Sequence, residues 1–259
     1  MTVNAQPLAL GRKPALRSII VLLATLAAIL AAPVLEWTGV GLTAATFAND
    51  GDQTIRAAGY AFSIWGVIYL GAFIYAVWQI LPSTRETPEL AAVAWPSAIA
   101  LAGCAAWLVA ASLDIKAATV AIIVLSALAM ISGLLAARRA DGRLWPEGHR
   151  VIFWPLGLLG GWLTIASALN ILTVLTAWGV IGPDTAQAWA LGGIAAVVLV
   201  GGAVLLRLGH LAYGLPIAWG LAAVYVAERS DKPLVAWTAL GASGLMLLLS
   251  LWAGRRRRA

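Results

Sequence analysis

Eight long apolar runs, separated by short polar stretches, occupy most of this 259-residue chain. A helix needs about 20 mostly apolar residues to cross the hydrocarbon core of a bilayer. Runs of roughly that length cover residues 18–37, 60–81, 91–112, 117–137, 151–178, 186–206, 211–227 and 233–252. Only 11% of the residues are charged, against about 25% in soluble domains. We therefore expect an all-α polytopic integral membrane bundle of about eight transmembrane helices.

The basic residues predict the orientation of this bundle. With eight spans, most of them fall on the side that holds the N-terminus: Arg12, Lys13, Arg17, Arg85, Arg138, Arg139, Arg143, Arg150, Arg207 and the run Arg255, Arg256, Arg257 and Arg258. The opposite side holds only Arg56, Lys116, Arg229 and Lys232. Short cytoplasmic loops carry an excess of Lys and Arg. We expect both termini in the cytoplasm, in a bacterial inner (plasma) membrane.

The net charge of +6 is spread over short clusters beside the apolar runs. Such clusters anchor a protein to anionic lipid, and they indicate membrane lipid rather than nucleic acid as the partner. The longest outward loop, residues 39–59, is polar and contains Phe47. A loop of this length is commonly functional, so we expect it to act as a lid.

The chain has 13 tryptophans, and twelve of them form two groups. Indole rings favour the membrane–water interface, which accounts for those near the ends of the apolar runs: Trp37, Trp78, Trp95, Trp154, Trp178, Trp189, Trp237 and Trp252. Trp65, Trp107, Trp162 and Trp219 lie within the runs. Such tryptophans either pack structurally or line a ligand cavity.

Polar groups inside the runs are few. Asn170 lies well inside the fifth run, where it predicts either an interhelical hydrogen bond or a ligand contact. Glu228 falls at the end of the seventh run, where we expect it to reach water. The single cysteine, Cys104, reads as a buried packing residue. His149 and His210 lack metal-ligand spacing, and we find no catalytic motif, so we expect neither a metal site nor an enzyme.

Two stretches resemble the TspO/MBR family, the tryptophan-rich sensory or translocator proteins. Residues 60–70 read YAFSIWGVIYL, with a Phe three residues before Trp65 and a Tyr four residues after it, like the second helix of the family. Residues 162–170 read WLTIASALN, like the fifth helix of the family, with Leu-Asn at the same spacing from Trp162. The motifs lie within residues 18–178. The chain departs from the family at 57–59, at 158–159 and at Cys104, where the family has two prolines, Pro-Tyr and Asn.

The resemblance implies a TspO/MBR-like five-helix bundle over residues 1–180 with a cavity that opens toward the outer loop. Residues 181–259 would then add a three-helix segment with a basic cytoplasmic tail. Family ligands are flat and hydrophobic, such as porphyrins, other tetrapyrroles and sterols, and none is a covalent cofactor. Carried over position by position, the ligand-binding residues are Trp65, Tyr69, Trp107, Trp162, Ala166 and Asn170.

Three functions remain open at this stage. The first is a receptor, sensor or carrier of a tetrapyrrole or sterol-like lipid. The second is a small-molecule transporter or exporter, and the absence of charge near the centre of any run disfavours an ion-coupled form of it. The third is an assembly scaffold of a larger membrane complex. TspO-like proteins are often dimers, so a homodimer is a further expectation.

Overall fold

The computed structural model describes residues 16–81, 87–140 and 146–256, and within them eight helices are long and apolar enough to cross a membrane. They are α1 (Leu16–Thr38), α3 (Ile64–Trp78, extended by the 3-10 helix η2, Gly59–Ser63), α4 (Pro88–Ser112), α5 (Lys116–Arg139), α6 (Pro146–Ala177), α7 (Pro183–Leu208), α8 (Leu211–Glu228) and α9 (Pro233–Arg256). Each contains most of one predicted apolar run. The predicted all-α membrane bundle of eight spans is confirmed.

Local sequence signals set the ends of several helices. The Thr87 side chain caps α4 by accepting from the Leu90 N–H at 3.4 Å, and Pro88 follows in the first turn, where its missing N–H costs nothing. Gly209 ends α7 in the left-handed conformation at φ 60°, which glycine adopts without strain. The His210 side chain then caps α8 by accepting from the Ala212 N–H at 3.3 Å. These signals make α7 and α8 an antiparallel pair with a two-residue link.

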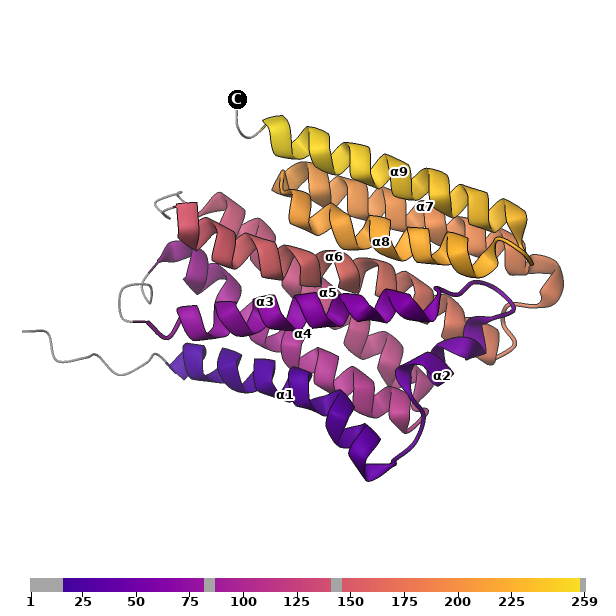
Figure 1. Ribbon diagram of the computed structural model, residues 1–259, viewed down its shortest axis with the longest axis horizontal. Coiled ribbons are helices and arrows are strands. Elements are labelled where there is room, and N and C mark those ends of the chain that lie inside the picture. The colour runs from indigo at the N-terminus through magenta and orange to yellow at the C-terminus, as the bar shows by residue number, and fades with distance from the viewer. Residues whose placement is uncertain (1–15, 82–86, 141–145, 257–259) are drawn as a thin grey trace, which may run out of the picture.

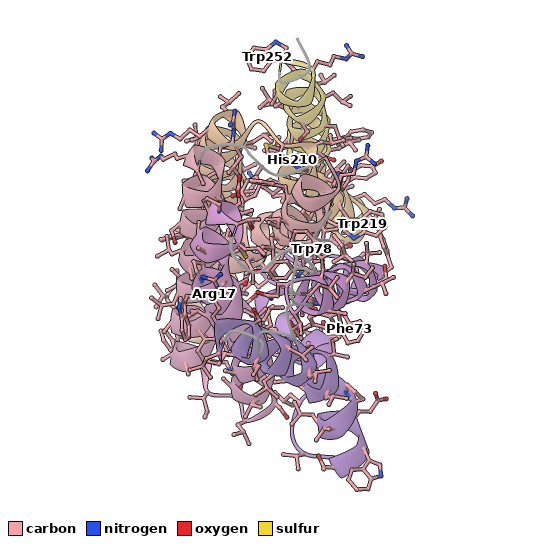
Figure 2. All side chains as sticks on the ribbon, turned by 90° about the vertical axis from the view of Figure 1, so that its left-hand side faces the viewer. Arg17, Phe73, Trp78, His210, Trp219 and Trp252 are labelled. Carbon is pink, nitrogen blue, oxygen red and sulfur yellow. The ribbon has the colours of Figure 1, made fainter. Side chains whose placement is uncertain are left out.

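Helix α6 lies at the centre of the fold, in contact with α3 and α5 on one side and with α7 and α8 on the other. Figure 1 shows α7, α8 and α9 as a separate layer above α6, with α1 at the far edge of the molecule. The beginning of α1 and the end of α9 lie at the same end of the bundle (Figure 1). Figure 2 looks onto that end, where Arg17 of α1, Trp78 of α3 and Trp252 of α9 are labelled. The common end agrees with eight crossings, and which membrane face it meets remains a prediction.

The contact between α6 and α8 is unusually close. A Cβ atom built on Gly161 would lie 2.0 Å from the carbonyl oxygen of Tyr213 and 2.7 Å from Cγ of Pro216. One turn further along α6, Thr164 Oγ1 and the Tyr213 hydroxyl share a hydrogen bond of 2.7 Å. Small residues allow membrane helices to approach this closely, and hydroxyls join them. The layer formed by α7–α9 is therefore packed directly against the helix that carries Trp162.

The tryptophans near helix ends follow the interfacial expectation. Seven of the eight are exposed on the surface of the bundle: Trp37, Trp95, Trp154, Trp178, Trp189, Trp237 and Trp252. Trp78 is half-buried. Trp219, expected within a span, is 38% exposed and donates its indole N–H to the Ala61 carbonyl at 3.1 Å. It therefore joins α8 to η2.

Two carboxylates are buried near helix ends. Glu228, which we expected to reach water, is only 1% exposed, so that expectation is wrong. The structure encloses it between the end of α8 and the loop before η2, where it accepts a hydrogen bond from the Arg56 N–H. Glu89, in the first turn of α4, is 2% exposed, and its carboxylate oxygens have no hydrogen-bond partner among the described residues. The positive end of the α4 dipole favours a negative charge there.

Candidate functional site

An aromatic cavity with a volume of about 90 Å³ lies among α2 (Ala44–Ala48), η2, α3, α4, α5 and α6. All six residues predicted as ligand-binding line it: Trp65, Tyr69, Trp107, Trp162, Ala166 and Asn170. These residues come from three helices and are far apart in the sequence. The structure thus brings every member of the predicted set to one place, while their contact with a ligand remains a prediction.

Helix α3 contributes a stacked aromatic pair. Trp65 and Tyr69 are four residues apart, so their side chains project from the same face of the helix. Their rings stack with centroids 4.9 Å apart and planes inclined by 25°. Phe62, three residues before Trp65, also lines the cavity. The pair presents a broad aromatic surface to the cavity.

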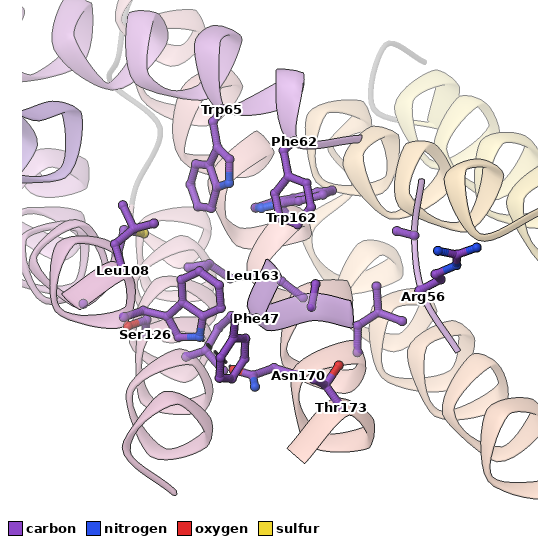
Figure 3. Close-up of a pocket in the computed structure, with 18 of the residues that line it drawn as sticks. Phe47, Arg56, Phe62, Trp65, Leu108, Ser126, Trp162, Leu163, Asn170 and Thr173 are labelled. Carbon is purple, nitrogen blue, oxygen red and sulfur yellow. Dashed lines mark hydrogen bonds between the residues drawn. The ribbon is translucent and has the colours of Figure 1, made fainter. Parts of the chain in front are cut away.

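Helix α6 forms the opposite wall. Trp162, Ala166 and Asn170 recur at four-residue intervals and therefore share one helix face. Trp162 is 4% exposed, and its ring meets Trp65 edge to face at a centroid distance of 6.0 Å. Ala166 keeps the wall below Trp162 thin, which leaves space between the aromatic rings and Asn170. Figure 3 shows Trp65, Phe62 and Trp162 at one end of this space and Asn170 at the other.

Asn170 holds three helices together at the base of the cavity. Its Oδ1 accepts a hydrogen bond from Trp107 Nε1 of α4 at 2.7 Å, and its Nδ2 donates to Thr119 Oγ1 of α5 at 3.2 Å. Asn170 is 5% exposed. Of the two roles that the sequence predicts for Asn170, the structure shows the interhelical hydrogen bond. Asn170 also lines the cavity, and its contact with a ligand remains a prediction.

Replacement of Asn170 by leucine is expected to lower the free energy of unfolding by about 1–3 kcal/mol, the usual cost of leaving buried polar partners unsatisfied. The indole N–H of Trp107 and the hydroxyl of Thr119 would both lose a bond. Thermal melting of the purified protein in detergent measures the effect. Ser132→Ala is the control, because Ser132 is exposed and bonds only within its own helix. Equal melting temperatures for Asn170→Leu and wild type would contradict the network.

The loop between α1 and η2, residues 39–58, roofs the cavity, and we call it the outer segment. Phe47 in α2 is 1% exposed and meets Trp107 edge to face at 5.9 Å. Ile55 and Ala57 line the cavity from the second half of the segment. The loop that we expected to act as a lid therefore covers the cavity and places one aromatic ring inside it.

Several lining residues were not predicted. Cys104, expected to be a packing residue, is buried and also lines the cavity, as do Phe62 and Ser126. Phe62 stands in the quoted motif and could have been included. Ser126 of α5 had no sequence signal, because a lone serine in an apolar helix usually bonds to its own backbone. Ser126 does so here, at 2.7 Å from the Ile122 carbonyl.

Hydrogen-bond donors without partners face the cavity. The side chains of Trp65, Tyr69 and Trp162 make no hydrogen bond within the described part of the chain, whereas the indole of Trp107 is paired with Asn170. An indole nitrogen can only donate. Figure 3 shows the indole nitrogens of Trp65 and Trp162 on the facing sides of their rings. The cavity thus combines apolar surface with donors that are available to an acceptor.

A family model described as TSPO-like protein matches residues 15–252. The chain belongs to the TSPO-like family. No curated protein and no solved structure matched it. The match includes α7, α8 and α9, beyond residues 18–178 where the motifs were recognised. For this TSPO-like chain, the division into domains at residue 180 remains a prediction.

The cavity of this TSPO-like protein can hold the edge of a flat apolar molecule between aromatic walls. Its volume of about 90 Å³ accommodates a few waters, whereas sites for drug-sized ligands have roughly 300–1,000 Å³. A planar macrocycle therefore requires the roof to move. A second hollow of about 590 Å³ lies between α6 and α7 and is lined by small residues such as Gly192 and Gly193. It is more open than the cavity, and it contains none of the predicted site residues.

Proposed function

We propose that this membrane protein is a receptor, sensor or carrier for a flat hydrophobic ligand, with a tetrapyrrole such as a porphyrin as the expected class. The observation that carries the proposal is the set of aromatic walls formed by Trp65, Tyr69 and Trp162 around one cavity. Aromatic faces bind planar rings through large contact areas and favourable stacking. Membership of the TSPO-like family supports the same class.

The unpaired donors narrow the chemistry of the ligand. Trp65 Nε1, Trp162 Nε1 and the Tyr69 hydroxyl can each donate to the edge of a bound ring. A bound ligand would cover these donors, and burial of a donor without a partner is costly. A ligand whose edge carries carbonyl or carboxylate oxygens would satisfy these groups, whereas a hydrocarbon edge would leave them unpaired. We therefore propose a planar ligand with acceptor oxygens, which protoporphyrin IX represents.

The other functions are weaker candidates. A scaffold needs no cavity, and nothing in the roofed aromatic chamber is required for docking onto another protein. A transporter or exporter would use the same chamber and would differ by releasing ligand on both sides of the membrane. We propose binding rather than catalysis, in a bacterial inner membrane with both termini cytoplasmic. A homodimer remains part of the proposal and is tested by the mass of the detergent-solubilised protein.

Protection of Cys104 by the ligand tests the proposal. This single cysteine lines the cavity, so a ligand bound there covers its sulfur atom. Protoporphyrin IX, added in the dark, is expected to slow alkylation of Cys104 by N-ethylmaleimide with saturation at micromolar concentrations. Etioporphyrin, which has the same ring with only alkyl substituents, is expected to protect less.

Two results would contradict the proposal. If protection rises linearly without saturation, the porphyrin merely partitions into the micelle. If Cys104 is not protected at porphyrin concentrations where equilibrium dialysis detects binding to the protein, the ligand binds elsewhere. Equal protection by both porphyrins would leave the aromatic site intact and remove the requirement for acceptor oxygens. Flux of a protected ligand in proteoliposomes would favour the carrier form.

A further inference from the structure

Helix α8 supplies no lining residue of the cavity described above, yet it is bonded to the roof at two places and to η2 at a third. Arg56 N–H donates to Glu228 Oε1 at 2.8 Å. Ala58 N–H donates to the Ala223 carbonyl at 3.0 Å. Beyond the outer segment, the Trp219 indole donates to Ala61 of η2 at 3.1 Å. The second half of the roof is thus attached to a helix outside the cavity.

Glu228 is the centre of this attachment. Its carboxylate is 1% exposed, and Oε2 pairs with Lys232 Nζ at 2.8 Å while Oε1 accepts from Arg56 N–H. The same Lys232 ammonium donates to the Asp52 carbonyl oxygen. One carboxylate and one ammonium therefore hold two backbone positions of the outer segment, four residues apart.

A carboxylate at the position of Glu228 carries an energetic cost that its partners must offset. Glu228 is the last residue of α8, where the negative end of the helix dipole disfavours an acidic side chain. A buried carboxylate is also costly unless it is paired and hydrogen-bonded. The partners that offset these costs are Lys232 and the backbone of the outer segment. The carboxylate thus keeps its Lys232 partner in any case, and it gains the Arg56 hydrogen bond only while the segment is docked.

The first half of the roof is held differently. Leu42 N–H donates to the Ser112 carbonyl at 2.9 Å, and a Cβ on Gly41 would lie 2.0 Å from that same oxygen. Phe47 is buried against Trp107. Tight backbone packing and a buried ring fix this half to α4. In the second half, Thr54 is buried and shares a hydrogen bond of 2.6 Å with Thr176 of α6, and Ile55 is also buried. The Arg56 and Asp52 side chains are 39% and 47% exposed, so residues 56–58 depend most on the polar bonds to α8.

We propose that Glu228 is a positioning residue for the roof of the cavity. Its carboxylate holds the backbone of Arg56 against α8, and through Lys232 that of Asp52. Thr54 stays bonded to Thr176 of α6, so loss of the hold frees residues 56–58 and opens the cavity at the edge that Arg56 and Ala57 line. The cavity of about 90 Å³ is too small for a planar macrocycle while this half is docked. Helix α8 therefore controls access to a chamber that it does not line. This inference concerns access alone and does not depend on which ligand binds.

The rate of Cys104 modification measures opening without any ligand. Cys104 is 4% exposed and lines the cavity. The probe is the trimethylammonium-ethyl methanethiosulfonate reagent, whose fixed charge keeps it out of the micelle interior. Glu228→Gln keeps the shape of the side chain but removes the charge that pairs with Lys232. We expect it to speed modification about tenfold, the effect of losing one charge-assisted hydrogen bond.

Two further variants separate access from general loosening. Lys232→Gln removes the ammonium that pairs with Glu228, and the Lys232 side chain is 23% exposed. This variant should speed Cys104 modification in the same way, and it keeps the test open if Glu228→Gln does not fold. Ser243→Ala is the matched control, because Ser243 is 4% exposed and its hydroxyl bonds α9 to the Ala218 carbonyl of α8 rather than to the outer segment. In this variant, Cys104 should be modified at the wild-type rate.

Wild-type rates for both Glu228→Gln and Lys232→Gln would overturn the inference. So would an equal acceleration by Ser243→Ala, because the attachment would then act only through the stability of the α8–α9 pair. Porphyrin binding is measured separately. A failure of ligand protection leaves the access result standing, and a failure of the access result leaves the ligand site standing.

Discussion

Replacement of both Trp65 and Trp162 by alanine is expected to weaken saturable binding of protoporphyrin IX at least about 100-fold. Buried tryptophan anchors at binding sites commonly contribute about 2 kcal/mol or more each, and about 1.4 kcal/mol corresponds to a factor of ten. The two rings meet edge to face at 6.0 Å across the cavity. Their loss removes stacking surface from α3 and α6 together with two unpaired donors.

Quenching of tryptophan fluorescence in the detergent-purified protein measures this effect. With 13 tryptophans in the chain, quenching of the wild type is strong but includes a nonspecific part. The matched control is the Trp95→Ala, Trp189→Ala double variant, because these rings are 51% and 43% exposed on the outside of the bundle. It also removes two fluorophores and should keep the saturable component.

Saturable quenching that persists unchanged in the Trp65→Ala, Trp162→Ala variant would place the ligand outside the cavity. Linear quenching in all three proteins would mean that the porphyrin only partitions into detergent. That result would favour the transporter and scaffold functions over the receptor function, because neither depends on this aromatic pair. Loss of saturation in the control variant alone would move the site to the outer tryptophans.

The membrane architecture could be predicted because it depends on composition and run length. Apolar runs of about 20 residues specify spanning helices almost regardless of tertiary context. Gly214 and Pro216 are residue types that helix interiors disfavour, yet α8 forms as Leu211–Glu228. Both residues are buried in its packing: Gly214 against Ser250 of α9, and Pro216 close to Gly161 of α6. Packing between helices thus explains residues that helix propensity alone disfavours.

The site could be predicted in part, because short sequence motifs mark some of its residues. Trp65, Tyr69, Trp162 and Asn170 were found through motifs on two helices, and the four-residue spacing then placed them on common faces. Composition alone would have left Trp219 an equal candidate, although it joins α8 to η2 outside the cavity. Ring positions relative to a cavity depend on helix rotation, which the sequence pattern of an all-round apolar helix does not determine.

The burial of Glu228 could not be predicted from the amino-acid sequence. Its partners, Arg56 and Lys232, lie on opposite sides of it in the sequence, and Arg56 is separated from it by 172 residues. A carboxylate at a helix end usually reaches water. Only the packing of the outer segment over the end of α8 encloses it, and that packing is a property of the whole fold.

Replacement of Gly161 by alanine is expected to have the largest effect on stability. The added Cβ would lie 2.0 Å from the Tyr213 carbonyl oxygen, a backbone atom that cannot move without its helix, and 2.7 Å from Pro216. Helices α6 and α8 would have to separate. Changes that disrupt a buried helix contact can exceed about 4 kcal/mol. We expect little monodisperse protein after detergent extraction, as measured by size-exclusion chromatography, and a large fall in melting temperature.

Gly192→Ala is the matched control, because nothing lies within 4 Å of a Cβ at that position in α7. Alanine inside a helix is favoured over glycine by roughly 0.5–1 kcal/mol, so this variant should melt at or above the wild-type temperature. A normal melting temperature for Gly161→Ala would show that α6 and α8 can move apart freely. The two helices carry Trp162 and Glu228, so such freedom would also uncouple the wall of the cavity from the attachment of its roof.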